Sequence, residues 1–412
     1  MTNAIATTRP EGDEDMFAAL VAQPADALLG LIALYRDDQR TAKIDLGVGV
    51  FRTDDGRTPV MRAVKAAEKR LIHEQTSKSY LGAEGDVAYT DLLGEVVLGP
   101  EMARSDRITG VQTPGGTGAL RLGAELLKRA RPNATVWIGT PTWPNHGPIF
   151  IEAGMAVRAH RFYDVASATI DFDAMLEDLE RAAAGDIVLF HGCCHNPTGA
   201  ALSMQQWQAI ADLCAERNLL PLIDLAYQGL GDDLEGDAAA TRFLFAKLPS
   251  AILAYSCDKN FGLYRERVGA LWVQAPSPAS IAVVRGNMLS LARSLWSMPP
   301  DHGAAIVRTI LGSPVLRDDW MSELAEMRGR INLLRSALAA AHPDLAFIGD
   351  QRGMFAMLPI GADAVVAMRR NSGIYMAGNG RINIAGLTVQ NIPAFVAGLT
   401  PHLCNRMPMH DG

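Results

Sequence analysis

The segment 255–267 holds a lysine and an arginine, Lys259 and Arg267, eight residues apart. A lysine amine can form a Schiff base with an aldehyde, and an arginine fork can hold a phosphate through paired hydrogen bonds. Such a pair is by itself most often a solvated surface feature. Here the mostly apolar residues 252–256 and 268–273 predict buried strands on either side, so Lys259 lies where a strand gives way to a loop. Ligands of open α/β sheets bind at such strand ends. A cofactor with both an aldehyde and a phosphate, such as pyridoxal phosphate, would suit the pair.

Other candidate ligand-binding residues also follow predicted strands. In the segment 114–118, Pro-Gly-Gly-Thr-Gly, free backbone amides at a helix start favour an anion such as phosphate, although a plain tight turn explains it equally well. Trp143 could stack on a flat ring, although a core tryptophan is more usual. Asn196 could donate a hydrogen bond to a phenolate oxygen, but an Asn-Pro turn also accounts for it.

Asp224 stands at the end of the apolar run 220–223. A carboxylate there is costly to bury without a cationic or hydrogen-bonding partner, and a protonated pyridine nitrogen is such a partner. The pairing would keep the ring able to accept electrons from a carbanion. Tyr227 could bond the same ring, and a helix N-cap is the alternative explanation of Asp224. Each feature is modest alone, but their succession along the chain indicates one cofactor site.

Composition and charge narrow the class of protein. The chain has 412 residues, of which 49% are hydrophobic and 20% charged, as in a globular enzyme of about two domains. A net charge of −7 argues against nucleic acid as a main partner. The acidic start is unlike a signal peptide, and no apolar run approaches the roughly 18–20 residues of a membrane span. The five cysteines show no metal-ligand spacing, which predicts reduced thiols, no metal and a cytoplasmic location.

Periodicity predicts an α/β fold with a mostly parallel sheet of seven strands flanked by helices. Strands are expected at 108–112, 135–139, 157–162, 187–191, 220–223, 252–256 and 270–274, and helices at 119–130, 171–183 and 203–217. Earlier in the chain we expect a helix over 16–36 with a start signal at 24–26, a strand at 44–50 and a helix at 60–75. A long helix at 316–341, apolar segments at 346–348 and 354–358, a helix at 362–371 and a strand at 381–385 predict a smaller α+β domain.

Over roughly residues 16–399, the chain resembles the class I aminotransferases of fold type I. It is close to the bacterial aspartate and aromatic amino-acid aminotransferases. The segments that carry the resemblance are 24–26, 45–50, 80–82, 115–120, 144–146, 191–199, 224–229, 259–269, 299–300 and 380–386. The resemblance implies an N-terminal arm at 1–15, a small domain formed by 16–58 and 316–412, and a large pyridoxal-phosphate-binding domain at 59–315. It also implies a homodimer with shared active sites.

The resemblance implies a role in cofactor binding for each matching residue. Lys259 would carry the cofactor and then move a proton between the substrate Cα and cofactor C4′. Asp224 would pair with the pyridinium, with His146 behind it. The ring would be contacted by Tyr227 and Asn196 and stacked by Trp143. The phosphate would be held by Gly116, Thr117, Ser256 and Arg267, joined by Tyr80 of the neighbouring subunit.

Substrate residues follow in the same way. Arg381 would bind the α-carboxylate, with Gly49, Trp143 and Asn196 beside the substrate, and Arg293 would reach across the dimer to a side-chain carboxylate. The implied reaction transfers an amino group from tyrosine, phenylalanine or aspartate to 2-oxoglutarate by ping-pong chemistry through pyridoxamine phosphate. Two arginines would suit a dicarboxylate.

Three departures from the family pattern matter. Leu295-Trp296 replaces a more polar pair and favours aromatic substrates. Gly115 lacks a hydroxyl that some relatives add to the phosphate site. Asp258 stands where many relatives carry a small polar residue. Because adjacent side chains usually diverge, we expect Asp258 at a surface or interface, away from the Lys259 amine.

Three other functions remain open at this stage. The chain could be a strict aspartate aminotransferase, or a pyridoxal-phosphate lyase or decarboxylase, since the same ring and lysine serve those reactions. A cofactor-binding regulatory module would need an attached DNA-binding domain, but only about fifteen residues, mostly polar and acidic, precede the first predicted helix.

Overall fold

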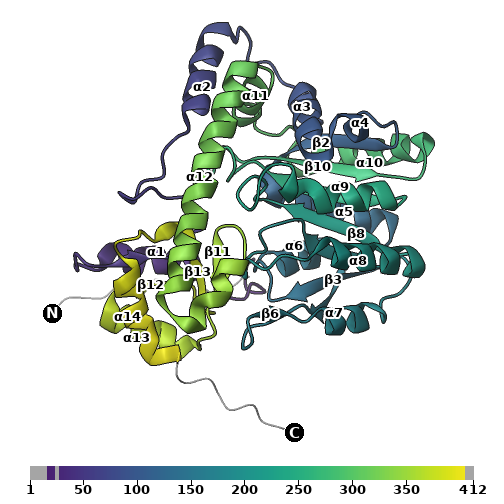
Figure 1. Ribbon diagram of the computed structural model, residues 1–412. Helices are drawn as coiled ribbons and strands as arrows, with labels where there is room; N and C mark the ends of the chain where they lie inside the picture. The colour runs from purple at the N-terminus through teal and green to yellow at the C-terminus, as the bar shows by residue number, and fades with distance from the viewer. Residues whose placement is uncertain (1–15, 24–26, 404–412) are drawn as a thin grey trace, which may run out of the picture.

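The computed structural model describes residues 16–23 and 27–403. Its centre is a seven-stranded sheet in the order β2-β10-β9-β8-β7-β3-β4 (Figure 1). The strands are β2 (Ile108–Pro114), β3 (Thr135–Thr140), β4 (Ala156–Arg161), β7 (Ile187–His191), β8 (Leu220–Leu225), β9 (Ala251–Ser256) and β10 (Val268–Gln274). Only β10 runs antiparallel to its neighbours. The predicted α/β fold with seven mostly parallel strands is therefore confirmed.

Both faces of the sheet are covered by helices, because the central strands are apolar on both sides. Ile187 and Leu189 of β7 belong to one core cluster, whereas Val188 and Phe190 belong to the other, as the two-residue period of a strand requires. The helices α5 (Gly115–Ala130), α6 (His146–Glu152) and α10 (Pro278–Leu295) contribute to the first cluster. The second receives α2 (Arg62–Glu74), α3 (Val87–Leu98), α7 (Phe172–Leu179), α8 (Met204–Arg217), α9 (Gly236–Lys247) and α11 (Asp301–Leu311).

The elements that form a third core cluster lie to one side of the seven-stranded sheet, at the lower left of Figure 1. It is built from β1 (Ile44–Asp45), β11 (Phe355–Met357), β12 (Ile374–Tyr375), β13 (Arg381–Asn383), α13 (Ala362–Ser372) and α14 (Ile392–Leu403). The long helix α12 (Pro314–Ala341) connects the cores, since Trp320 and Ile331 pack in the sheet core while Leu334 and Leu338 pack in the third cluster. This arrangement agrees with a smaller α+β unit carried by α12.

The remaining elements are short. They are α1 (Ala27–Asp37), α4 (Pro100–Ala103), the antiparallel pair β5 (Tyr163–Asp164) and β6 (Thr169–Ile170), and the 3-10 helices η1 (Pro343–Asp350) and η2 (Ile384–Gly386). The apolar residues 346–348 thus lie in a 3-10 helix, and the strand expected at 381–385 ends at Asn383.

Two expectations near the N-terminus are wrong in extent. The helix expected over 16–36 is absent from 16–23, where residues 16–19 form a turn, and α1 begins only at Ala27. Pro24 explains this break, because proline lacks an amide hydrogen and disfavours helix in the residue before it. The start signal at 24–26 and the arm at 1–15 lie outside the described residues. The strand expected at 44–50 stops at Asp45, whose carboxylate then accepts a hydrogen bond from the Gly47 amide at 3.0 Å.

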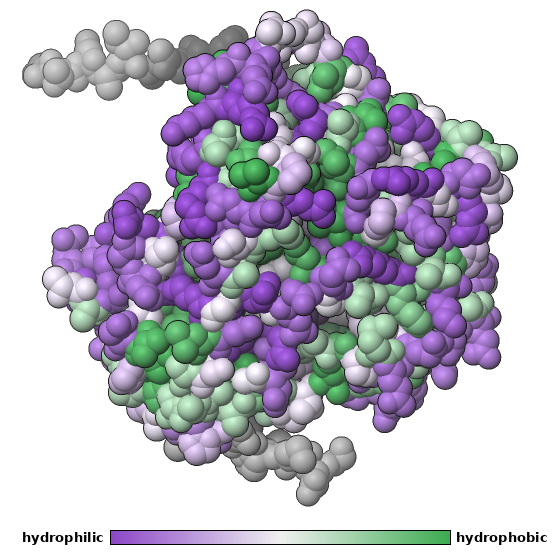
Figure 2. All heavy atoms as spheres, turned by 45° about the horizontal axis from the view of Figure 1, so that its top comes forward, coloured by the Kyte–Doolittle hydropathy of each residue, from purple (hydrophilic) through white to green (hydrophobic). Residues whose placement is uncertain are grey.

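The surface drawn in Figure 2 mixes hydrophilic and hydrophobic residues, with green clusters separated by purple side chains. Within the described residues, no helix is both long and apolar enough to cross a bilayer.

Candidate active site

A cavity of about 300 Å³ opens at the carboxyl ends of β8 and β9, beside the start of α5. Eleven of the fourteen residues selected from the sequence line it, namely Gly49, Gly116, Thr117, Trp143, Asn196, Asp224, Tyr227, Ser256, Lys259, Arg267 and Arg381. The other three are His146, Tyr80 and Arg293. Segments separated by more than three hundred residues in sequence therefore meet at one place.

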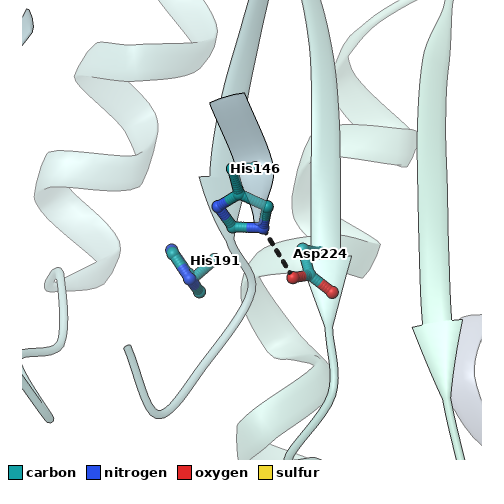
Figure 3. Close-up of side chains that lie close together, drawn as sticks. All are labelled: His146, His191 and Asp224. Atoms are coloured by element: carbon teal, nitrogen blue, oxygen red, sulfur yellow. Dashed lines mark hydrogen bonds and ion pairs between the residues drawn. The ribbon is translucent and has the colours of Figure 1, made fainter. Parts of the chain in front are cut away.

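Asp224 is the last residue but one of β8, near the strand end that the sequence predicted, and it is 8% exposed. Its Oδ2 lies 3.0 Å from Nε2 of His146, the first residue of α6 (Figure 3). Nδ1 of that imidazole lies 2.7 Å from the Thr142 hydroxyl. Burial raises the pKa of the Asp224 carboxyl, but the His146 hydrogen bond, together with the nearby Lys259 amine, outweighs burial, so the pKa is lowered. Asp224 is consequently an ionised carboxylate that faces the cavity.

A second histidine completes this polar end of the cavity. The His191 ring at the end of β7 lies 5.1 Å from the His146 ring, centre to centre, and faces the same carboxylate (Figure 3). Burial lowers its pKa to about 3, so the ring is neutral near pH 7. His191 was not among the site residues predicted from the sequence, although its place at a strand end was a usable signal.

Lys259 lies three residues beyond β9 in a tightly bonded turn. The Cys257 amide donates to Val268 O at 2.9 Å, and the Gly262 amide donates to Lys259 O at 3.2 Å. The Lys259 amine lies 5.4 Å from the centre of the Tyr227 ring. Burial lowers the pKa of Lys259, and the charges of Asp258 and Asp224 oppose this effect without cancelling it. The amine is therefore easier to deprotonate than an exposed lysine.

The position of Asp258 corrects the sequence-based expectation. We expected it at a surface or interface, but it is 4% exposed and lines the cavity. Its Oδ2 lies 2.5 Å from Nη1 of Arg267 and 3.8 Å from Nζ of Lys259. Arg267 reaches back along the turn, and this ion pair holds the Asp258 side chain inside.

The glycine segment forms the first turn of α5 and faces Ser256 and Arg267. Gly115 has φ of +68°, and a Cβ there would lie 2.5 Å from Nη2 of Arg267. A Cβ on Gly116 would lie 3.0 Å from the Cβ of Ser256. The α5 N-terminus has no side-chain cap, so its backbone amides are available to an anion.

Arg381 forms the wall contributed by the small α+β unit. Its Nη2 donates to Gly47 O at 2.8 Å, and the guanidinium lies 4.8 Å from the centre of the Phe355 ring. Phe355 and Arg381 come from the antiparallel pair β11–β13. Burial lowers the pKa of Arg381, which is a cation held without a carboxylate partner among the described residues. Such a cation is suited to a carboxylate ligand.

Three further predicted residues line the space between these walls. Asn196 is 5% exposed, and its Oδ1 has no hydrogen-bond partner within the described ranges. Tyr227 is buried, and burial raises its pKa, so the phenol is protonated. Trp143 is half-buried and meets His146 edge to face at 5.3 Å between ring centres. Tyr264 and Phe355 also line the cavity and were not selected from the sequence, because local pattern does not report on contacts between distant segments.

Tyr80 and Arg293 do not line this cavity of the described single chain. Tyr80 is 92% exposed. Arg293 is exposed in the last turn of α10, where its guanidinium hydrogen-bonds the Ser297 hydroxyl.

Comparison with known proteins places these residues in a family. Residues 41–399 match the model of the aminotransferases of class I and II. The chain belongs to this family. It is 53% identical over 376 residues to the tyrosine aminotransferase of Rhizobium meliloti, which covers 90% of this chain and 96% of that protein. It is 42% identical over 385 residues to the aspartate aminotransferase of Escherichia coli, which covers 92% and 97%.

The solved structures agree with the sequence match. The aromatic-amino-acid aminotransferase of Burkholderia pseudomallei, covalently bound to pyridoxal phosphate, superposes with a TM-score of 0.91 at 38% identity, covering 94% of this chain and 99% of that one. This protein is accordingly an aminotransferase that uses pyridoxal phosphate.

The residues around the cavity fit this cofactor. The glycine turn of α5, whose closest approaches leave no room for a Cβ, offers backbone amides opposite Ser256 and Arg267. The ionised Asp224 and the Lys259 amine line the same cavity as this turn. An anion site, an amine and a buried carboxylate match the phosphate, the aldehyde and the ring nitrogen of pyridoxal phosphate.

Proposed function

We propose that the protein transfers the amino group of tyrosine, phenylalanine or aspartate to 2-oxoglutarate. The observation that carries the proposal is that one cavity unites the Lys259 amine, the Asp224 carboxylate with His146 behind it, and the cation Arg381, which has no carboxylate partner among the described residues. A proton carrier, an ionised support for the ring and a carboxylate receptor are the three functions that transamination requires.

The proposed contacts with the cofactor divide between its two ends. Gly116, Thr117, Ser256 and Arg267 would hold the phosphate, with Tyr80 supplied by a partner subunit. Asp224 would hold the ring nitrogen, and the Asp224 charge is maintained by its hydrogen bond with His146. Tyr227 and Asn196 would bond the ring oxygen and Trp143 would cover the ring face.

When bound, pyridoxal phosphate supplies a cationic ring that withdraws the electrons left at the substrate Cα on deprotonation. Lys259 supplies the base. Its burial lowers the pKa of the amine, so that the neutral form which accepts the Cα proton is more accessible near neutral pH. Arg381 would orient the substrate through its α-carboxylate, with Gly49 leaving room for it. A Cβ at position 49 would lie 2.8 Å from the Phe355 ring.

The choice of amino donor rests on the surroundings of the substrate side chain. A neighbouring cavity of about 660 Å³ shares Trp143 and Arg381 with the first and is lined by the apolar residues Leu31, Leu34, Val365, Val366 and Met376. Apolar walls favour an aromatic side chain. Leu295-Trp296 beside Arg293 and the similarity to a tyrosine aminotransferase support the same preference.

The same proposal includes a homodimer. Tyr80 and Arg293 lie outside the cavity of their own chain, and Met16, Phe17, Leu20 and Val21 are each at least 72% exposed. In the proposed dimer a partner subunit covers this apolar segment, and Tyr80 and Arg293 of each subunit enter the neighbouring site. Cytoplasmic location is part of the proposal as well, supported by the free thiols of Cys193, Cys194, Cys214 and Cys257.

Steady-state kinetics test the proposal directly. At fixed 2-oxoglutarate, kcat/KM should be higher for tyrosine and phenylalanine than for aspartate, with glutamate formed in each case. Higher kcat/KM for aspartate alone would identify a strict aspartate aminotransferase. Alanine and carbon dioxide from aspartate, without glutamate, would identify a decarboxylase.

A further inference from the structure

Asp258 is a buried carboxylate between two cations at the phosphate end of the cavity. Its side chain is 6% exposed, its Oδ2 lies 2.5 Å from Arg267 Nη1, and the same oxygen lies 3.8 Å from Lys259 Nζ. Its Oδ1 is buried and has no hydrogen-bond partner in the described part of the chain. The fold holds Asp258 firmly, because its amide donates to the Ser256 hydroxyl at 3.3 Å at the end of β9.

The contact between Asp258 and Arg267 uses the guanidinium that a phosphate would also use. Nη1 of Arg267 donates to Asp258 and, at 3.2 Å, to Tyr264 O. On the other side, Nη2 lies against Gly115, the residue at the opening turn of α5. Asp258 and an anion at the α5 N-terminus would therefore share one guanidinium.

Two anions at one arginine repel each other, and the burial of Asp258 strengthens the repulsion although the Arg267 side chain is partly exposed. Few cations lie close enough to reduce this repulsion. Lys259 is the second cation beside Asp258, and its ammonium is replaced by a Schiff-base nitrogen, with loss of water, when the amine reacts with an aldehyde. Gly115 supplies no hydroxyl to offset the effect. Affinity for a phosphate-bearing ligand is thus lower with Asp258 than with a neutral residue.

We propose that Asp258 is a built-in counter-ion of Arg267 that competes with the cofactor phosphate and so weakens the binding of pyridoxal phosphate. This inference rests on the proposed role of Arg267 in holding the phosphate. The carboxylate keeps the guanidinium paired when no phosphate is bound, and it must share that cation when the phosphate arrives.

The test compares the Kd of pyridoxal phosphate for the full-length protein and its Asp258→Asn variant, measured by equilibrium dialysis of the cofactor-free forms. Pyridoxal, which lacks the phosphate, is measured in parallel. The variant should bind pyridoxal phosphate about tenfold tighter, with the affinity for pyridoxal changed far less. Inorganic phosphate should also compete more strongly in the variant. An unchanged or weaker affinity for pyridoxal phosphate, or an equal gain for pyridoxal, overturns the proposal.

Matched variants separate this effect from others. Asp258→Glu keeps the charge and should keep the weaker affinity, and Asp258→Ser serves if the asparagine variant does not fold. Asp178→Asn also removes one negative charge, from the pair that Asp178 forms with Arg161 at 2.7 Å outside the cavity, and should leave the Kd unchanged. If the unmodified protein binds pyridoxal phosphate no better than pyridoxal, the proposed phosphate site itself is wrong. If the protein prefers pyridoxal phosphate to pyridoxal and Asp258→Asn does not increase that preference, only the counter-ion role of Asp258 is refuted.

Discussion

His146 Nε2 and Asp224 Oδ2 lie 3.0 Å apart, and neither side chain has more than a tenth of its surface exposed. The Thr142 hydroxyl fixes the other nitrogen of the imidazole at 2.7 Å. A buried carboxylate held in this way stays ionised and cannot rotate away from the cavity. The chemistry proposed for the protein depends on this pair, because the cofactor ring attracts electrons only while its nitrogen is protonated.

The first prediction concerns the charge of Asp224. Asp224→Asn removes the charge and keeps the shape, so kcat should fall by about 10²–10³-fold, the usual effect of losing one preorganised electrostatic contact. Steady-state transamination with tyrosine and 2-oxoglutarate measures it. Asp237→Asn tests a generic effect of losing a buried carboxylate, since Asp237 bonds the Gly229 and Gly231 amides away from the cavity. A kcat within twofold of the unmodified value for Asp224→Asn would remove Asp224 from the mechanism.

A second prediction concerns pH. His146 lowers the pKa of Asp224 through its hydrogen bond, so His146→Asn should let that pKa rise. The protonated acid cannot hold a pyridinium, and the acidic limb of the kcat profile should move to higher pH. His160→Asn is the matched control, because His160 is a buried histidine that does not line the active-site cavity. An acidic limb at the same pH in both variants would show that His146 does not tune Asp224.

The sequence predicted the sheet and the cavity well for physical reasons. All seven strands were expected, because most of them are apolar runs with polar residues at their ends, although the edge strand β4 is largely exposed. Asp224 and Lys259 were recognised because a carboxylate and an amine at strand ends are costly to bury without a ligand.

The side-chain contacts between distant segments were not predictable in the same way. Asp258 was misplaced because sequence adjacency to Lys259 does not show that Arg267 turns back to bind it. Phe355 was missed because its contact with Arg381 depends on the pairing of β11 with β13. The domain boundaries after residues 58 and 315 stay predictions.

A third prediction concerns stability. Arg335 on α12 is 2% exposed and donates to four carbonyl oxygens, those of Ile348, Arg352, Gly353 and Phe355. Arg335→Met removes these four hydrogen bonds from a buried site and should lower the free energy of unfolding by about 3 kcal/mol. Denaturant unfolding followed by circular dichroism measures the loss. Arg328→Met on the same helix removes a single bond to Gly229 O at 3.2 Å and should cost much less. Equal losses in the two variants would contradict the role given to Arg335.

A fourth prediction tests the shared sites of the proposed homodimer. Arg293→Ala and Lys259→Ala proteins should each be nearly inactive with aspartate and 2-oxoglutarate. Their random mixture after joint refolding should recover about a quarter of the normal activity, because half the dimers then hold one complete site of two. If Arg293 served its own subunit, no mixture would recover activity.

The most direct test asks where the cofactor is attached. Purified protein is incubated with pyridoxal phosphate, reduced with borohydride, digested and mapped by mass spectrometry. The reduced adduct should be found on Lys259, and the Lys259→Ala variant should carry none on the peptide that spans residues 255–267. A fully folded protein that shows no adduct, or an adduct on another lysine alone, would contradict the assignment of this cavity as the active site.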